Sequence, residues 1–346
     1  MKLVIQIPCF NEQQTLPQTI RDLPKSIPGI DRIEVLVVDD GSTDRTVEVA
    51  RLCGAHHILS LGTNRGLGRA FAAGLEKAVF LGADMVVNTD GDNQYMGADI
   101  AKLVEPILQQ QADMVVGCRP IVNHPEFSPL KKLLQLAGSW TLRLLSKTSA
   151  RDAPSGFRAF SREACLRLVI YSRFSYCMET LIQAGNSHLR VASVDIRVNS
   201  NTRRSRLYKS TPEYLWKSGF TMVTMFVHYR PSLFFGLLSA VNFAGASFLG
   251  LRFLYLVYFT RIMVMEHRTY LPSLILLAVL AIFGAGLATL AIVADLLRGN
   301  RRLSEEILYQ LRRQAVERSN SVPASSQNEP PAEQALAAIQ DHSRSE

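Results

Sequence analysis

Two long stretches without a charged residue constrain the fold of this chain more than any other feature. They run from Ser232 to Leu251 and from Leu271 to Ala294. A helix of about 20 residues crosses a hydrocarbon core of about 30 Å, so each stretch is long enough to span a membrane. We therefore predict two transmembrane helices, at about 232–259 and 271–297, within a membrane region of residues 231–298.

The distribution of basic residues predicts how these helices are oriented. The short connection between them holds Arg261 and Arg268, whereas basic residues are denser on the outer flanks, which the positive-inside rule places in the cytoplasm. The chain opens on a strand-like run and not on a signal peptide. We expect an integral membrane protein with both termini and the N-terminal domain cytoplasmic. The flanking cations are Lys209, Lys217, Arg230, Arg298, Arg301 and Arg302.

The region before the membrane has the pattern of an α/β domain. Strand-like apolar runs at 3–7, 34–38, 85–89 and 114–117 alternate with helix-like segments. Such alternation is typical of a largely parallel sheet covered on both faces. We predict a catalytic domain over 1–211, an interfacial amphipathic helix over 212–230, and after the two spans a cytoplasmic tail, 299–346, disordered after about 318.

Overall charge and cysteine content narrow the class of partner. The net charge of +8 is concentrated near the membrane region, which suits anionic headgroups or a phosphorylated lipid. We expect no nucleic-acid partner, because no motif for one is present. The five cysteines show neither CxxC nor Cys/His metal spacing, so we expect reduced structural thiols.

Acidic residues at two strand ends predict a nucleotide and metal site. Asp90 and Asp92 directly follow the apolar run 85–87, and Gln94 adds a third oxygen ligand. At the carboxyl edge of an open α/β sheet, such ligands hold Mg²⁺ or Mn²⁺ that bridges phosphate oxygens. Asp39 and Asp40 end the run 34–38, where by analogy with dinucleotide folds an acid hydrogen-bonds a ribose.

Three further segments have both a functional and an ordinary interpretation. Glu12 lies in a Pro-fixed turn after the first strand, which is also simple loop chemistry. Residues 151–158 place a carboxylate and a hydroxyl between two arginines, and the same pattern forms turns. The basic run 203–209 suits a lipid phosphate, and equally a solvated positive-inside flank.

Taken together, these motifs resemble family 2 glycosyltransferases of the GT-A fold, in the membrane-anchored branch of dolichyl- or polyprenyl-phosphate sugar transferases. The resemblance covers about residues 3–210. It implies a GT-A (Rossmann-like) catalytic domain followed by the interfacial helix and two spans. The matching motifs are IPCFNE (7–12), VVDDGSTD (37–44), NRG (64–66), DGDNQ (90–94), GCR (117–119) and SGFR (155–158).

The resemblance also implies a role for each matching residue. The base and ribose of the donor would be held by Pro8, Phe10, Glu12, Val38, Asp39 and Asp40, with Asp90, Gly91, Arg203 and Lys209 also at the donor nucleotide. The metal would be bound by Asp90, Asp92 and Gln94, and the acceptor phosphate by Arg119, Arg151 and Ser155. Asp92, Asp152 and Arg119 are the expected catalytic residues, and Asp152 would orient the acceptor or act as a base.

The activity implied is inverting transfer of one sugar from a nucleotide-diphosphate sugar, of the UDP-glucose or GDP-mannose type, to a polyprenyl phosphate at the cytoplasmic membrane face. The chain departs from the family at Gly91, Phe10 and Cys118, none of which is a metal ligand or an expected charge. The motifs leave open the sugar, the base, the lipid length and the destination of the product.

Other interpretations fit the sequence less well. A haloacid-dehalogenase-like phosphatase would carry its acids on the first strand, with Thr or Val where Gln94 stands. A non-catalytic nucleotide-binding scaffold would have lost an acid or an acceptor-side cation, and a different lipid acceptor stays open. A processive polymer synthase would need more spans. Small residues at 245–250 and 284–286 allow close helix packing, either within the pair or in a homo-oligomer.

Overall fold

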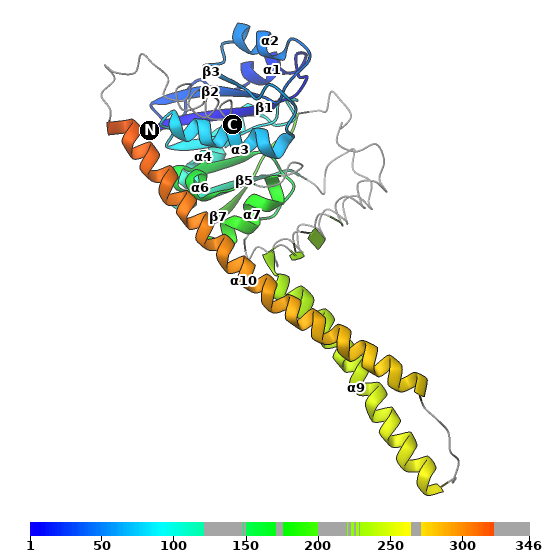
Figure 1. Cartoon of the computed structure of the whole chain (residues 1–346). Coiled ribbons are helices and arrows are strands. Elements are labelled where there is room, and N and C mark those ends of the chain that lie inside the picture. Colours follow the sequence, from blue (N-terminus) through cyan, green and yellow to red (C-terminus); the bar gives the residue numbers. More distant parts are fainter. Residues whose placement is uncertain are drawn as a thin grey trace, which may run out of the picture. The chain divides into compact units, whose positions relative to one another are not determined.

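We describe the fold from a computed structural model of the chain (Figure 1). The residues described are 1–120, 148, 150–170, 176–199, 220, 223–224, 226–227, 229–263 and 271–321. They form two compact units. One contains the described residues of 1–200 together with those from 307 onward, and the other contains those of 201–306. Each unit is described by itself.

The first unit is built on a seven-stranded sheet, with strand order β3-β2-β1-β4-β6-β5-β7 among the described residues. All neighbouring strands are parallel except at β6, which runs antiparallel to both β4 and β5. The prediction of a largely parallel sheet is therefore confirmed. The strands are β1 (Lys2–Cys9), β2 (Arg32–Asp39), β3 (His57–Ser60), β4 (Met85–Asn88), β5 (Met114–Cys118), β6 (Arg158–Ser161) and β7 (Val191–Asp195).

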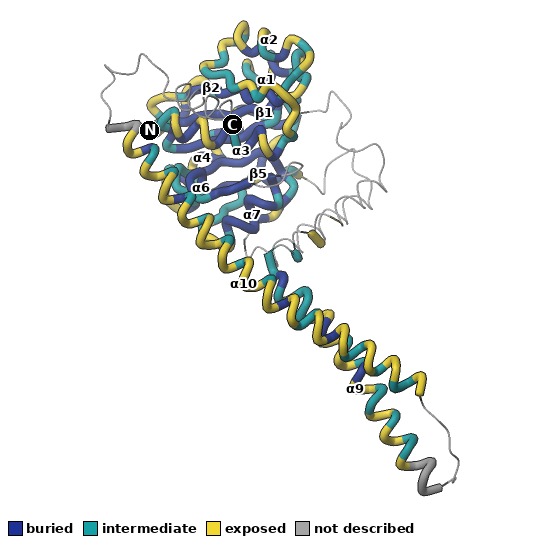
Figure 2. The backbone as a smooth tube through the Cα atoms, in the orientation of Figure 1, coloured by how far each residue is buried: buried dark blue, intermediate teal, exposed yellow. Residues whose placement is uncertain are grey.

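Helices cover both faces of this sheet, and Figure 2 shows the strands buried between them. Side chains alternate across a strand, so Leu3 and Ile5 face the apolar cluster that includes Ile100. Gln6 faces the other way and lies close to Gly74. The helices are α1 (Leu16–Arg21), α2 (Thr46–Leu52), α3 (Leu67–Phe80), the short 3-10 helix η1 (Gly97–Asp99), α4 (Ile100–Leu108), α6 (Arg162–Arg167) and α7 (Tyr176–Asn186).

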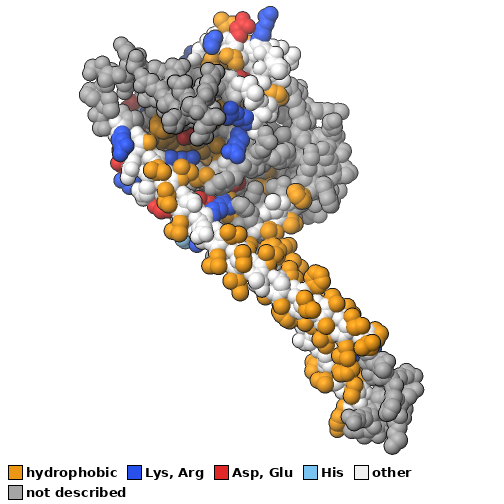
Figure 3. Space-filling view, viewed as in Figure 1, with side chains coloured by type: hydrophobic (Ala, Val, Ile, Leu, Met, Phe, Trp, Pro, Cys, Tyr) orange, Lys and Arg blue, Asp and Glu red, His pale blue; other side chains and the backbone are white. Residues whose placement is uncertain are grey.

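The second unit contains the apolar helices that the sequence predicted. Helix α9 (Pro231–Met263) and helix α10 (Leu271–Ser321) are both long and apolar enough to cross a membrane. Hydrophobic side chains crowd the surface of this pair in Figure 3. Ser239 Oγ donates a hydrogen bond of 2.8 Å to the carbonyl of Gly284, which joins the two helices at a small residue. These features suggest a membrane protein.

Helix α10 continues beyond the predicted end of its span. It remains helical through residues 299–321, where the sequence predicted the start of a tail, and from residue 307 it belongs to the first unit. The predicted disorder after about 318 lies almost wholly outside the described residues, as does most of the predicted interfacial helix. The domain boundaries drawn from the sequence stay predictions.

Candidate active site

The carboxyl ends of three adjacent parallel strands, β2, β1 and β4, converge on the Asp-x-Asp segment that follows β4. The carbonyl of Gly91 accepts hydrogen bonds from the hydroxyls of Thr15, at 2.8 Å, and Thr19, at 3.2 Å. A Cβ at Gly91 would lie 3.0 Å from Cys9 Sγ and 3.4 Å from Glu12 Cγ. The Asp-x-Asp segment therefore packs directly against the loop that leaves β1.

The Asp90 carboxyl lies where its surroundings disfavour the charged form. Part of the residue is exposed, but its carboxyl is enclosed by protein atoms, and this desolvation raises its pKa to about 7. The charges of Asp92 and Glu12 act in the same direction, and that of Arg119 opposes them. Among the described residues, the neighbouring negative charges and burial thus outweigh the effect of Arg119 on Asp90.

This arrangement fits a divalent cation. Two carboxylates one residue apart supply hard oxygen ligands, and the backbone N–H of Gln94 donates to Asp92 Oδ1 at 3.1 Å, which fixes the turn. Among the described residues, no group of three or more His, Cys, Asp or Glu side chains can hold a metal ion. A cation at Asp90 and Asp92 would therefore complete its coordination with other oxygens, such as those of Gln94, water or a phosphate.

The second acid pair is occupied by hydrogen bonds within the protein. Asp39 accepts from the Ser42 N–H and from the Ser60 hydroxyl, each at 2.9 Å. Asp40 accepts from the backbone N–H groups of Arg65, at 2.7 Å, and Gly66, at 2.9 Å. Both carboxylates are buried and hold the loops at the carboxyl ends of the strands.

Four of the remaining predicted donor residues lie at the same edge of the sheet. Pro8 in β1 is paired with Val38 in β2, and Phe10, which follows β1, is 40% exposed. Glu12 accepts a hydrogen bond of 2.8 Å from the Thr15 hydroxyl. Arg203 and Lys209 lie outside the described residues.

Arg119 and Asp152 form a buried ion pair at the end of β5. Arg119 Nε lies 2.8 Å from Asp152 Oδ2 and Nη2 lies 3.0 Å from Oδ1, while the Arg119 backbone N–H also donates to Oδ2 at 3.1 Å. The Asp152 carboxylate therefore receives three hydrogen bonds from one residue. Arg151, by contrast, is exposed and pairs with Asp195 at 2.9 Å.

The loop between Asp152 and β6 carries an unusual buried hydroxyl. Ser155 is fully buried, and its Oγ has no hydrogen-bond partner among the described residues. Such an atom costs free energy unless a ligand or water pairs with it. A Cβ at the next residue, Gly156, would lie 3.2 Å from both carboxylate oxygens of Asp90. The loop therefore lies beside the Asp-x-Asp segment.

Three buried residues hold this loop, of which Asn88 and Tyr176 were given no role from the sequence and Arg158 was treated only as part of the 151–158 pattern. Asn88 Nδ2 donates to the Gly156 carbonyl, at 3.0 Å, and to Tyr176 Oη, at 2.8 Å. The fully buried Arg158 guanidinium donates to the carbonyls of Ser155 and Ala153 and to groups on α7. The available signal for Asn88 was a polar residue directly after the apolar run 85–87.

A second segment approaches the Asp-x-Asp turn from β7. The Asn199 N–H donates to the Gln94 carbonyl at 2.9 Å, and Tyr95 forms an isolated antiparallel bridge with Val198. Arg197 binds the buried Asp99 carboxylate with contacts down to 2.7 Å. The described chain therefore lies beside the Asp-x-Asp turn up to Asn199, and the predicted basic loop lies outside the described residues.

Comparison with known proteins identifies the family. Residues 4–168 match the profile of glycosyl transferase family 2. Over 213 residues the chain is 33% identical to the UDP-N-acetylglucosamine–dolichyl-phosphate N-acetylglucosaminyltransferase of Methanococcus voltae, a match that covers 55% of this chain and 83% of that protein. The chain belongs to glycosyl transferase family 2. Over 169 residues this glycosyltransferase is also 32% identical to the undecaprenyl-phosphate mannosyltransferase of Micrococcus luteus, covering 46% of this chain and 66% of that protein.

A solved structure agrees on the fold. Glucosyl-3-phosphoglycerate synthase from Mycobacterium tuberculosis, crystallised with Mn²⁺, uridine diphosphate and phosphoglyceric acid, superposes with a TM-score of 0.50 at 20% identity, covering 65% of this glycosyltransferase and 77% of that chain. The predicted family, enzyme class and GT-A fold are confirmed. The roles of individual residues stay predictions.

Proposed function

We propose that this glycosyltransferase moves a single sugar from a nucleotide-diphosphate sugar to a polyprenyl phosphate at the cytoplasmic face of a membrane, with inversion at the anomeric carbon. The observation that carries the proposal is that two segments of different chemistry lie beside each other in one site. The Asp-x-Asp turn lies on one side, and the loop that holds the orphaned Ser155 hydroxyl lies on the other, within contact distance of Asp90. Relatives that act on dolichyl and undecaprenyl phosphates support the choice of acceptor.

On the donor side, Asp90, Asp92 and Gln94 would hold Mg²⁺ or Mn²⁺. When bound, the cation neutralises the diphosphate leaving group. The crystallised neighbour with Mn²⁺ and uridine diphosphate supports this assignment. The nucleoside would lie against Pro8 and Val38, with Phe10 as a stacking surface, flanked by Glu12, Asp39, Asp40 and Gly91 and covered by the loop that contains Arg203 and Lys209.

On the acceptor side, Arg119, Arg151 and Ser155 would bind the lipid phosphate. The buried Ser155 hydroxyl would gain the partner that it lacks. Asp152 already receives three hydrogen bonds from Arg119, and we assign it to orienting that guanidinium toward the acceptor rather than to taking a proton.

The reaction then needs no strong general base. An oxygen of the lipid monophosphate is already anionic at neutral pH and attacks the anomeric carbon. The bond from that carbon to the diphosphate oxygen breaks on the opposite side, and the nucleoside diphosphate leaves with the electron pair. Cationic residues around the two phosphates stabilise the charge that moves from one to the other.

The test is sugar transfer by the full-length protein in detergent. UDP-glucose, UDP-N-acetylglucosamine and GDP-mannose, each radiolabelled, are offered separately with undecaprenyl phosphate and Mg²⁺ or Mn²⁺. Asp92→Asn is the site variant, and Asp31→Asn, at an 87% exposed carboxylate, is the matched control. We expect labelled lipid from one donor, dependent on metal and lost in Asp92→Asn alone.

Two other outcomes would change the proposal. Hydrolysis of a donor without lipid product would point to a different lipid acceptor. A protein that binds no nucleotide with metal and gives no product would support the non-catalytic scaffold.

A further inference from the structure

The last part of α10 docks onto the catalytic unit through side chains that the proposed chemistry does not use. Tyr309 and Val316 are almost fully buried, although they belong to a helix whose earlier part is largely exposed. The Tyr309 hydroxyl donates to the Glu163 carboxylate on α6, with oxygen distances of 3.0 and 3.1 Å. The Arg167 guanidinium lies 4.2 Å from the centre of the Tyr309 ring.

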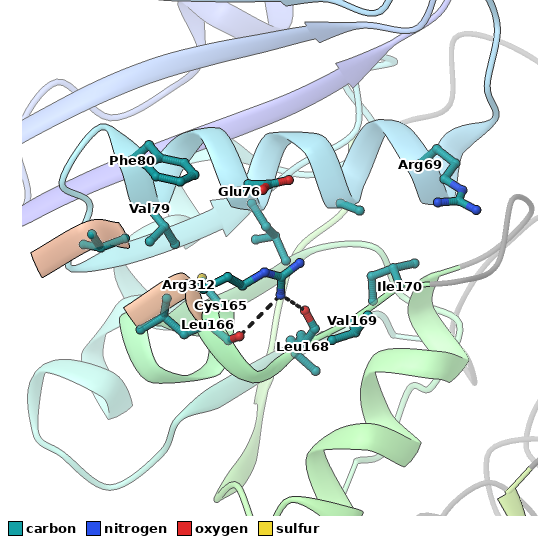
Figure 4. Close-up of a pocket in the computed structure, with 13 residues that line it drawn as sticks. Arg69, Glu76, Val79, Phe80, Cys165, Leu166, Leu168, Val169, Ile170 and Arg312 are labelled. Carbon is teal, nitrogen blue, oxygen red and sulfur yellow. Dashed lines mark hydrogen bonds between the residues drawn. The ribbon is translucent and has the colours of Figure 1, made fainter. Parts of the chain in front are cut away.

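Arg312 makes the second docking contact, at the carboxyl end of α6. One guanidinium nitrogen donates to the carbonyls of Leu168, at 2.9 Å, and Leu166, at 3.3 Å (Figure 4). The last carbonyls of a helix have no partner within the helix, so Arg312 caps α6 from another element. The docking segment, defined as residues 307–318, thus fixes both α6 and the chain that leaves it.

Arg312 lies beside a cavity, so close packing alone does not fix the position of its side chain. The cavity has a volume of about 220 Å³ and lies between α3 and the segment from Cys165 to Ile170, with Arg312 and Val316 on its wall. Figure 4 shows the Arg312 guanidinium extending among these side chains. Because space is left open there, the two hydrogen bonds from Arg312 act as directional restraints on the carbonyls of Leu166 and Leu168.

From Leu168 a chain of contacts leads to the active site. The next residue, Val169, donates its N–H to Gln183 Oε1 at 2.8 Å and accepts from Gln183 Nε2, which binds it to α7. At the start of α7, the ring of Tyr176 stacks on Phe71 at 3.8 Å between centroids. The Tyr176 hydroxyl donates to the Gly156 carbonyl at 3.1 Å, in the loop that contains Ser155.

We propose that Arg312, assisted by Tyr309, is a positioning residue for the acceptor loop 152–158. It acts through the carbonyls of Leu166 and Leu168, then through α7, on the loop in which Ser155 lies beside Asp90. The docking segment is a direct continuation of the helix that carries the second apolar stretch. The same helix therefore carries both the second apolar stretch and the residues that contact α6.

The kinetic part of the experiment measures the KM of the donor and the KM of the acceptor separately. This part rests on the proposed transfer activity. Arg312→Ala is compared with Arg312→Lys, which keeps one donor, and with Tyr309→Phe, which loses only the hydroxyl. Leu311→Ala is the matched control, because Leu311 lies on the same segment and is 57% exposed. We expect Arg312→Ala to raise the acceptor KM by about two- to thirtyfold, the range that such indirect changes produce, with the KM of the donor unchanged. Arg312→Lys should recover part of the loss.

Hydrogen exchange supplies a readout that needs no catalysis. In Arg312→Ala, peptides covering 152–158 and 176–183 should exchange faster, while those covering 34–39 in β2 should not change. An acceptor KM equal to that of Leu311→Ala, or a parallel rise in the donor KM, would overturn the proposal, as would unchanged exchange in the acceptor loop. If the parent enzyme transfers no sugar, the proposed function fails, and the exchange experiment still decides the positioning role.

Discussion

Arg119 and Asp152 are joined by a two-pronged ion pair, with Nε–Oδ2 at 2.8 Å and Nη2–Oδ1 at 3.0 Å, at the rim of the acceptor loop. The exposed fractions of the two side chains are 11% and 1%, so neither charge is well solvated. The fork geometry fixes the plane of the guanidinium, so this pair sets the direction in which the other N–H groups of Arg119 point.

Removing one member of this pair should destabilise the protein. Asp152→Asn leaves the Arg119 charge without its partner, which typically costs about 3–5 kcal/mol. We expect the midpoint of thermal unfolding to fall by about 6–20 °C, at about 2–4 °C per kcal/mol for a domain of this size. The double variant Arg119→Gln/Asp152→Asn should be less damaging than the sum of the two single changes. Strict additivity would show that the pair is not coupled.

Two glycines of the site should respond differently to alanine. A Cβ at Gly156 would lie 2.7 Å from Tyr176 Oη, and the stacked, buried Tyr176 ring cannot move away. Gly156→Ala should therefore cost about 1–3 kcal/mol and lower transfer activity, with partial rescue by Tyr176→Phe. In Gly91→Ala the new Cβ would meet only side-chain atoms, at 3.0 Å and beyond, so this variant should retain most activity. Equal losses in the two variants, measured by thermal unfolding and turnover, would contradict this contrast.

The Asp-x-Asp pair should be needed for metal-dependent donor binding. Asp92→Asn keeps the shape of the side chain but removes a hard anionic ligand, and turnover should fall by at least about a hundredfold, as for loss of one transition-state contact. Chelation of divalent ions in the parent enzyme should produce the same loss, reversed by adding Mg²⁺ or Mn²⁺. Calorimetric titration with nucleoside diphosphate and Mn²⁺ checks the binding step. Tight metal-dependent binding in Asp92→Asn would remove Asp92 from the ligand set.

Acid stability should depend on Asp99. Burial acts to raise its pKa, but hydrogen bonds from Arg197 and Lys102 outweigh burial, so the pKa lies below the ordinary value of 3.8. A lowered folded-state pKa contributes stability that is present above 3.8 and is lost as the pH falls through the folded value. The gap in unfolding temperature between the parent and Asp99→Asn should be constant above about pH 5 and should narrow below 3.8. A gap independent of pH from 3 to 6 would refute the assignment.

Much of the donor side could be predicted from the sequence because its signals are local. A continuous apolar run predicts a buried strand, and acids directly after it must lie at the carboxyl edge of the sheet. This reasoning located β1, β2, β4 and β5 and the Asp-x-Asp turn at the end of β4. The short strands β3, β6 and β7 were not predicted, because none of them is a continuous apolar run and their pairing partners are distant in the chain.

The acceptor side was harder to predict because its contacts join residues far apart in sequence. Arg119 and Asp152 were each named as functional, but their pairing depends on where β5 and the loop before β6 meet. Asp39 and Asp40 look alike in sequence, and the structure assigns their carboxylates to different loops. In the sequence Arg158 resembles a second cation of the loop, but its side chain is fully buried and donates to the Ser155 carbonyl.

By itself, the sequence determined the alternating α/β class, the two apolar helices and the chemistry available at the strand ends, since hydrophobic period, run length and residue type are properties of neighbouring positions. Only the tertiary structure decided which buried polar groups satisfy each other and which of them, among the described residues, are left unpaired. It also placed Tyr309 and Arg312 of α10 against α6. The reason is physical: the free energy of a buried polar group depends on whether a partner lies within hydrogen-bond distance, and folding brings together partners that chain order does not reveal.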